Sequence, residues 1–252
     1  MRTRRAPTVL VLAVCACLCL PLTAQKKGGQ RKADPGPQPR VVAAPPGKAP
    51  ADAVVLFDGR DMSAWTTADG GPARCEVANG EMSCRSGVGD IYSREKFGSA
   101  QIHVEFNVPH MPEHTGQMRG NSGVYVQSCF EIQILDSHNN PTYPNGSCGA
   151  VYGFAPPLVN ASRAPGEWQS YDIVYRAPMC DAAGAVTSPG SITVLHNDVL
   201  VQNGLKIDKK GPGCRPATAC EPAGLQLQDH SGFPNAPVTV MRFRNIWARR
   251  LE

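Results

Sequence analysis

The chain has 252 residues, of which 42% are hydrophobic and 18% are charged, and its formal net charge is +4. Residues 1–50 carry nine Lys and Arg against one Asp, so subtraction leaves 16 basic and 20 acidic residues from position 51 onward, about −4. A net acidic body excludes nucleic-acid binding through a broad basic face.

The first 24 residues are predicted to be a secretory signal peptide. Three arginines precede an apolar run from Val9 to Leu22, and small residues follow up to Ala24. The run is too short for a membrane span, and no later stretch of the chain is predicted to be one. Three cysteines in the run, at positions 15, 17 and 19, make a lipoprotein signal the alternative, but no convincing lipobox precedes them. We therefore expect an exported protein, periplasmic or secreted.

Residues 25–51 are rich in Lys, Pro and Gly and show no periodic hydrophobicity, which is typical of a disordered linker. The rest, residues 52–252, is long enough for one large β domain with a full core.

Seven cysteines remain after the signal peptide. In CEVANGEMSC an Asn-Gly pair predicts a two-residue hairpin turn, which places Cys75 opposite Cys84. The expected Cα separation of roughly 4.5 Å suits a disulfide, and export makes oxidation favourable.

The other cysteines give weaker signals. We expect Cys129 to pair with Cys148 and Cys214 with Cys220, which leaves Cys180 unpaired. Zinc binding is the alternative, but no CxxC spacing supports it.

Short alternating segments dominate from residue 52 onward. QIHVEFNV places Ile102, Val104 and Phe106 on one face, and four other segments read likewise: SGVYVQS, YDIVYRA, SITVLHN and VTVMRFRNIWARR. Turn signals separate them at intervals that suit an antiparallel sandwich of roughly a dozen strands in two packed sheets. Two stretches without strand pattern, 109–120 and 209–222, are predicted to be loops.

The segment CFEIQILD, residues 129–136, contains polar residues within an apparent buried strand. Alternation turns Glu131 and Gln133 away from the core, toward a groove if that face is concave. A bulge near Leu135 would bring Asp136 to the same side. The segment resembles the E-x-D-x-x-E strand of jelly-roll glycosidases such as laminarinases and κ-carrageenases, with Gln133 and Asp136 in place of two carboxylates. The alternative is an ordinary solvated sheet face.

A second polar set lies near the C-terminus. GLQLQDHSG places Gln226, Gln228 and His230 on one face, and the final strand places Arg242 and Arg244 together. An imidazole that titrates near neutral pH is a common group for proton transfer.

Several segments together resemble the 3-keto-disaccharide hydrolase domain family. They are LFDGRDMSAW, GDIYSREKFG, RGNSGVYVQ, FEIQILD, GAVYG, GEWQSYDI, LQDH and RFRNIWARRL. The resemblance implies an all-β, concanavalin-like antiparallel β-sandwich (jelly roll) that acts on sugars oxidised to a ketone at C3. The loops at 109–119 and 209–222 depart from the family pattern.

Residue type, strand face and the resemblance together suggest roles for particular residues. Glu131 and His230 are the predicted catalytic pair, with His230 as base or acid and Glu131 as its partner in proton transfer. The predicted substrate-binding residues are Asn121, Gln133, Asp136, Trp168, Gln228, Arg242 and Arg244. Arg244 and Gln228 are assigned to the enolate oxygen or to sugar hydroxyls. No cofactor is required, and a divalent cation that bridges Glu131 and His230 is the alternative.

The predicted function is cleavage of 3-keto-glycosides or 3-keto-disaccharides by C2 proton abstraction and elimination, with net hydrolysis. The expected partners are the oxidised sugar and a sugar 3-dehydrogenase that supplies it. The alternatives are a non-catalytic carbohydrate-binding sandwich and a glycosidase that uses Glu131 and Asp136 as its two carboxylates.

Overall fold

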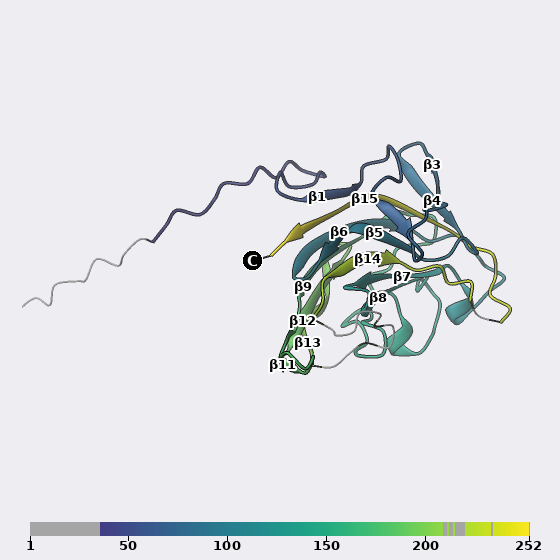
Figure 1. Ribbon diagram of the computed structural model, residues 1–252. Helices are drawn as coiled ribbons and strands as arrows, with labels where there is room; N and C mark the ends of the chain where they lie inside the picture. Colours follow the sequence, from purple (N-terminus) through teal and green to yellow (C-terminus); the bar gives the residue numbers. More distant parts are fainter. Residues whose placement is uncertain (1–35, 209–210, 212–213, 215–219, 233, 252) are drawn as a thin grey trace, which may run out of the picture. The chain divides into compact units, whose positions relative to one another are not determined.

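Two antiparallel β-sheets form the framework of the described chain in the computed structural model (Figure 1). The structure describes residues 36–208, 211, 214, 220–232 and 234–251, so the predicted signal peptide lies outside the described residues. Residues 36–40 belong to a separate N-terminal unit and contain no helix or strand. The main unit begins at Val41, earlier than the predicted start at residue 52, and Ala51 N donates to Ala43 O at 2.8 Å within it.

The larger sheet has eight strands. Along its path lie β13 (Val199–Ile207), β12 (Gly190–His196), β9 (Gln169–Arg176), β6 (Ala100–Asn107), β15 (Val240–Arg250), β4 (Glu81–Arg85) and β3 (Glu76–Ala78), and β1 (Val54–Phe57) also pairs with β15. The second sheet contains, in order, β2 (Trp65–Thr67), β5 (Ile91–Phe97), β14 (Ala223–Leu227), β7 (Asn121–Val126) and β8 (Phe130–Leu135). A two-stranded ribbon of β10 (Met179–Cys180) and β11 (Val186–Ser188) and two short 3₁₀ helices, η1 (Gly116–Met118) and η2 (Pro144–Gly146), complete the elements of the described part.

The two sheets stack face to face, which confirms the predicted jelly-roll sandwich. Figure 1 shows β6, β9, β12 and β13 curving around one side of the molecule, with β5, β14, β7 and β8 stacked inside the curve. Apolar alternation produces this packing: Ile102, Val104 and Phe106 of β6 are at most 2% exposed. The ring of Phe130 in β8 lies 6.0 Å from that of Tyr175 in β9, across the interface between the sheets.

The first predicted disulfide is present. Asn79 and Gly80 have φ values of 54° and 78°, as a two-residue hairpin turn between β3 and β4 requires. Cys75 and Cys84 are bonded with a Cα separation of 4.4 Å.

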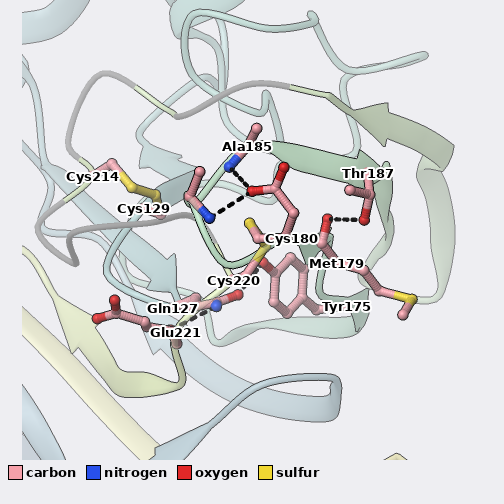
Figure 2. Close-up of a disulfide and its surroundings, with 12 residues drawn as sticks. Gln127, Cys129, Tyr175, Met179, Cys180, Ala185, Thr187, Cys214, Cys220 and Glu221 are labelled. Carbon is pink, nitrogen blue, oxygen red and sulfur yellow. Dashed lines mark hydrogen bonds between the residues drawn. A yellow bond between two sulfur atoms is a disulfide. The ribbon is translucent and has the colours of Figure 1, made fainter.

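The other expected cysteine pairs are wrong. Cys129 is bonded to Cys214 and Cys180 to Cys220 (Figure 2). Cys148 is a buried free thiol whose Sγ lies 3.0 Å from Tyr171 Oη. The prediction assumed pairing between neighbours in sequence. The actual bonds join segments 85 and 40 residues apart, brought together by the sheets.

Within the described residues, no helix has the length and apolar character needed to cross a membrane.

Candidate active site

A hollow of about 440 Å³ lies over β7, β8 and the end of β14, on the face of the five-stranded sheet that points away from the core. Its lining residues are Gln117, Met118, Tyr125, Cys129, Glu131, Gln133, Tyr143, Tyr152, Gln228 and His230. The two predicted catalytic residues therefore share one hollow, together with the predicted binding residues Gln133 and Gln228.

The alternation of β8 positions Glu131. Phe130, Ile132 and Ile134 are at most 1% exposed and pack in the core, so Glu131 points to the opposite face. Tyr125 of β7 lies directly across from it and donates its hydroxyl hydrogen to Glu131 Oε2 at 2.7 Å. The carboxylate is thus held by a side chain of the neighbouring strand.

Burial changes the acidity of Glu131. The side chain is 8% exposed, and loss of hydration raises the pKa of Glu131 to about 7. The hydrogen bond from Tyr125 acts in the opposite direction, and the negative charge of Asp90 adds to the increase. Glu131 can therefore gain or lose a proton near neutral pH.

His230 lies in the turn that follows β14. The turn is anchored by Asp229, whose Oδ2 accepts from the amides of Gly87 and Gly89 at 2.7 Å each, and whose own amide donates to Asp90 Oδ1 at 2.9 Å. Burial lowers the pKa of His230, although its backbone and the charge of Asp229 act in the opposite direction. The neutral imidazole is the favoured form.

A set of amide side chains forms the polar floor of the site. Gln228 Nε2 donates to Tyr125 Oη at 3.1 Å, which extends the chain of hydrogen bonds from Gln228 to Glu131. Gln133 Nε2 donates to Gln117 Oε1 at 3.1 Å and to Asn121 Oδ1 at 3.4 Å. Asn121, predicted to bind sugar, is 2% exposed and supports Gln133 and Gln117 from below the hollow.

Two tyrosines that the sequence analysis missed supply aromatic surface. Tyr143 and Tyr152 line the hollow, with their hydroxyl oxygens 2.9 Å apart and their ring centroids 6.4 Å apart. Burial, with a contribution from Tyr152, raises the pKa of Tyr143 to about 12, so its hydroxyl keeps its hydrogen. Both tyrosines come from irregular segments, where no periodic pattern indicates the direction of a side chain. Tyr125 could have been found, because the alternation of SGVYVQS places it on the Gly123 face.

Asp136 does not line the hollow, contrary to the prediction. The strand ends at Leu135, and Asp136 is 1% exposed, with Oδ2 3.1 Å from Arg119 Nε. Its Oδ1 accepts from the amide of His138 at 3.2 Å. The Asp136 carboxyl group therefore faces Arg119 and the amide of His138 rather than the hollow.

Arg242 and Arg244 are also absent from the hollow. Met241 and Phe243 of β15 pack in the core, so the arginines between and beyond them point away from it. They lie on the outer face of the eight-stranded sheet, whereas Glu131 lies on the outer face of the other sheet. The whole sandwich therefore separates them from the hollow.

The arginines have structural partners on their own face. Arg244 Nε lies 2.5 Å from Glu105 Oε2, and Arg242 Nη1 lies 3.1 Å from Glu81 Oε2. Trp168 belongs to the same cluster, with its ring centroid 4.1 Å from Arg244 Cζ and 5.6 Å from Arg242 Cζ. Trp168, predicted to bind sugar, does not line the hollow that contains Glu131, and its ring packs against the two guanidinium groups.

Among the described side chains, no group of three or more His, Cys, Asp and Glu residues converges in a way that could hold a metal ion. Glu131 and His230 are the carboxyl and imidazole groups that line the hollow, and a cation that bridges them stays a prediction.

Comparison with known proteins identifies the family of the chain. The model of the family described as "3-keto-alpha-glucoside-1,2-lyase-like domain" matches residues 52–249. The chain belongs to this family. Among proteins with curated functions, no significant match to the chain was found.

Solved structures with the same architecture come from Parabacteroides distasonis ATCC 8503. One, a candidate glycosyl hydrolase, is 38% identical over 85% of this chain and 93% of that chain, with a TM-score of 0.78. A second candidate glycosyl hydrolase from the same organism is 19% identical over 80% of this chain and 94% of that chain, with a TM-score of 0.57, and this likeness concerns the fold alone. The family and the 38% identical relative support a carbohydrate-active, hydrolase-like enzyme.

Proposed function

We propose that this protein cleaves 3-keto-glycosides or 3-keto-disaccharides by removing the C2 proton and eliminating the group at C1, with net hydrolysis when water adds back. The family description supports the class of substrate. The geometry that carries the proposal is the hollow shared by Glu131 and His230.

A ketone at C3 makes this chemistry feasible with few catalytic groups. The ketone acidifies the C2 proton, so one base can remove it and leave an enolate, and the C1–O bond can then break. The requirements are a base, a proton donor for the leaving oxygen and hydrogen-bond donors for the enolate oxygen. Burial raises the pKa of Glu131 to about 7 and lowers the pKa of His230, so the two groups can serve as the proton-transfer pair near neutral pH.

Tyr143 and Tyr152 can supply hydrogen-bond donors for the enolate oxygen. Of the two hydroxyl hydrogens on Tyr143 and Tyr152, their mutual hydrogen bond uses one, and the other is free for a sugar oxygen. Gln228 provides an amide group for sugar hydroxyls, and a hollow of about 440 Å³ falls within the usual size of a small-ligand site.

Three disulfides among the described residues favour an oxidising compartment, so we propose export to the periplasm or the exterior. A separate sugar 3-dehydrogenase would supply the ketone, because no nicotinamide or flavin motif occurs in the sequence.

The test is incubation of the mature protein with chemically prepared methyl 3-keto-glucosides of both anomers, and with the unoxidised glucosides. We expect release of methanol from at least one keto anomer, none from the unoxidised sugars, and loss of turnover in His230→Ala. Release from an unoxidised glucoside would contradict the proposal. Sugar binding without turnover in the unaltered protein, with binding that persists in His230→Ala, would indicate a binding module instead.

A further inference from the structure

The amide of Gln133 stands between Glu131 and a group of fixed oxygen atoms. On one side, its Nε2 donates to Gln117 Oε1 at 3.1 Å, to Asn121 Oδ1 at 3.4 Å and to Gly146 O at 3.4 Å. On the other side, its Oε1 faces Glu131 Oε1 at 2.8 Å and Ser122 O at 3.2 Å.

The oxygens around Gln133 Nε2 are fixed by backbone carbonyls. Gln117 Nε2 donates to Gly146 O at 3.0 Å, and Asn121 Nδ2 donates to Gln117 O at 2.9 Å. A carbonyl oxygen only accepts hydrogen bonds, so neither amide can turn around without placing oxygen against oxygen. The oxygens of Gln117 and Asn121 must therefore point toward Gln133.

The opposite orientation of the Gln133 amide has a clear cost. Its nitrogen would donate to Glu131 Oε1 at 2.8 Å and to Ser122 O at 3.2 Å, but its oxygen would then face Gln117 Oε1 at 3.1 Å. It would also lose the acceptors at Asn121 and Gly146. A buried amide oxygen with only acceptors around it is strongly unfavourable.

When Gln133 Nε2 faces Gln117 and Asn121, Gln133 Oε1 lies 2.8 Å from Glu131 Oε1. Two oxygens this close require a hydrogen between them. Amide oxygens carry none, so the hydrogen must be on Glu131 Oε1. The hydrogen bonds of the other carboxyl oxygen fit this position of the hydrogen. Glu131 Oε2 accepts the hydrogen of the Tyr125 hydroxyl, whose oxygen in turn accepts from Gln228 Nε2. The groups around the carboxyl favour the neutral acid as well: Asp90 contributes negative charge, and the remaining titratable neighbours in the hollow are tyrosines and His230.

We propose that Gln133 is a positioning residue that holds a proton on Glu131, so that Glu131 donates to the leaving oxygen while neutral His230 removes the C2 proton. This assignment rests on the proposed function. In the cycle, His230 takes the C2 proton and the C–H electron pair forms the C2=C3 enolate. The enolate then returns to the C3 ketone as a C1=C2 double bond forms and the C1–O bond breaks, and Glu131 protonates the released oxygen. Proton exchange with solvent then returns His230 to the imidazole and Glu131 to the acid.

Leaving groups of different basicity test the assignment. A methoxide leaving group needs a proton, whereas 4-nitrophenolate leaves without one. For Glu131→Gln we expect kcat/KM to fall by about 100-fold or more with methyl 3-keto-glucoside and by less than about 10-fold with 4-nitrophenyl 3-keto-glucoside. Gln133→Met, which keeps the size and removes both amide ends, should show the same pattern with smaller losses. The double variant should be no worse than Glu131→Gln.

An equal loss with both substrates, or additive losses in the double variant, would overturn the assignment. A second readout needs no turnover. Infrared spectra of the substrate-free protein at pH 6 should show a protonated carboxyl band that Glu131→Gln abolishes and Gln133→Met shifts or weakens. Absence of that band in the unaltered protein would also overturn the assignment, whereas its presence in a protein inactive on keto sugars would refute only the proposed function.

Discussion

Gly123 and Glu131 lie on the neighbouring strands β7 and β8, and the carboxylate occupies the space that a side chain at position 123 would need. A Cβ on Gly123 would lie 2.5 Å from Glu131 Oε1 and 2.8 Å from its Cγ. Real Cβ atoms do not approach so closely, so the position of the carboxylate depends on this glycine.

Gly123→Ala should therefore displace the Glu131 carboxyl group while leaving the sheet intact. We expect kcat/KM on 3-keto-glucosides to fall by about 10- to 100-fold, because small misplacements of a catalytic group are costly. The matched control is Gly98→Ala, where the nearest atom to a new Cβ is 3.9 Å away. Equal activity of the two variants would contradict the role of the space at position 123.

The hydroxyl of Tyr125 lowers the pKa of Glu131 through its hydrogen bond. Tyr125→Phe removes that bond, so the pKa of Glu131 should rise further above 7, by about one unit for a hydrogen bond to a charged group. The limb of the kcat/KM profile that reports Glu131 should move to higher pH. The same limb should be missing in the Tyr125→Phe and Glu131→Gln double variant, and a downward shift in the single variant would contradict the geometry.

Glu131 also makes stability depend on pH. Its pKa is about 7 in the folded state against 4.5 for the exposed group, so the folded state binds more protons between these values. The favourable contribution is fully present below about pH 4.5 and is lost as the pH rises through 7. Relative to wild type, Glu131→Gln should become more stable by up to about 3 kcal/mol between pH 4.5 and pH 8. Urea unfolding at both pH values checks this, and a constant difference would show that burial does not hold the proton.

Arg244 was predicted from the sequence to bind substrate, but in the structure it does not line the hollow. Because Arg244 pairs with Glu105 and lies over Trp168 on the other face of the sandwich, Arg244→Ala should keep kcat/KM within about 2-fold and lower stability by about 1 kcal/mol, as for an exposed cation–π pair. Steady-state kinetics and thermal unfolding measure the two effects. A large loss of activity at unchanged stability would return Arg244 to the site.

The strands could be predicted because their alternation is local. Ile102, Val104 and Phe106 alone identify the buried face of β6, and the Asn-Gly turn sets the register that joins Cys75 to Cys84. The faces of Glu131 and Gln133 follow from the same rule.

The rest of the site could not be predicted because alternation does not say which sheet a face belongs to. Arg244 and Glu131 both point away from the core, but from different sheets, and only the strand order separates them. Tyr143 and Tyr152 lie in irregular segments, where no alternation predicts the direction of their side chains. The partner of Cys129 is 85 residues away, so no local pattern predicts that disulfide.

Deuterium exchange at C2 tests the central claim most directly. The mature protein is incubated in D₂O with methyl 3-keto-glucoside, and the C2 position is followed by NMR in the remaining substrate and the product. We predict that the C2 hydrogen is replaced by deuterium during turnover, and that His230→Ala abolishes both exchange and cleavage. Cleavage that leaves the original C2 hydrogen in place would contradict proton abstraction in the hollow shared by Glu131 and His230.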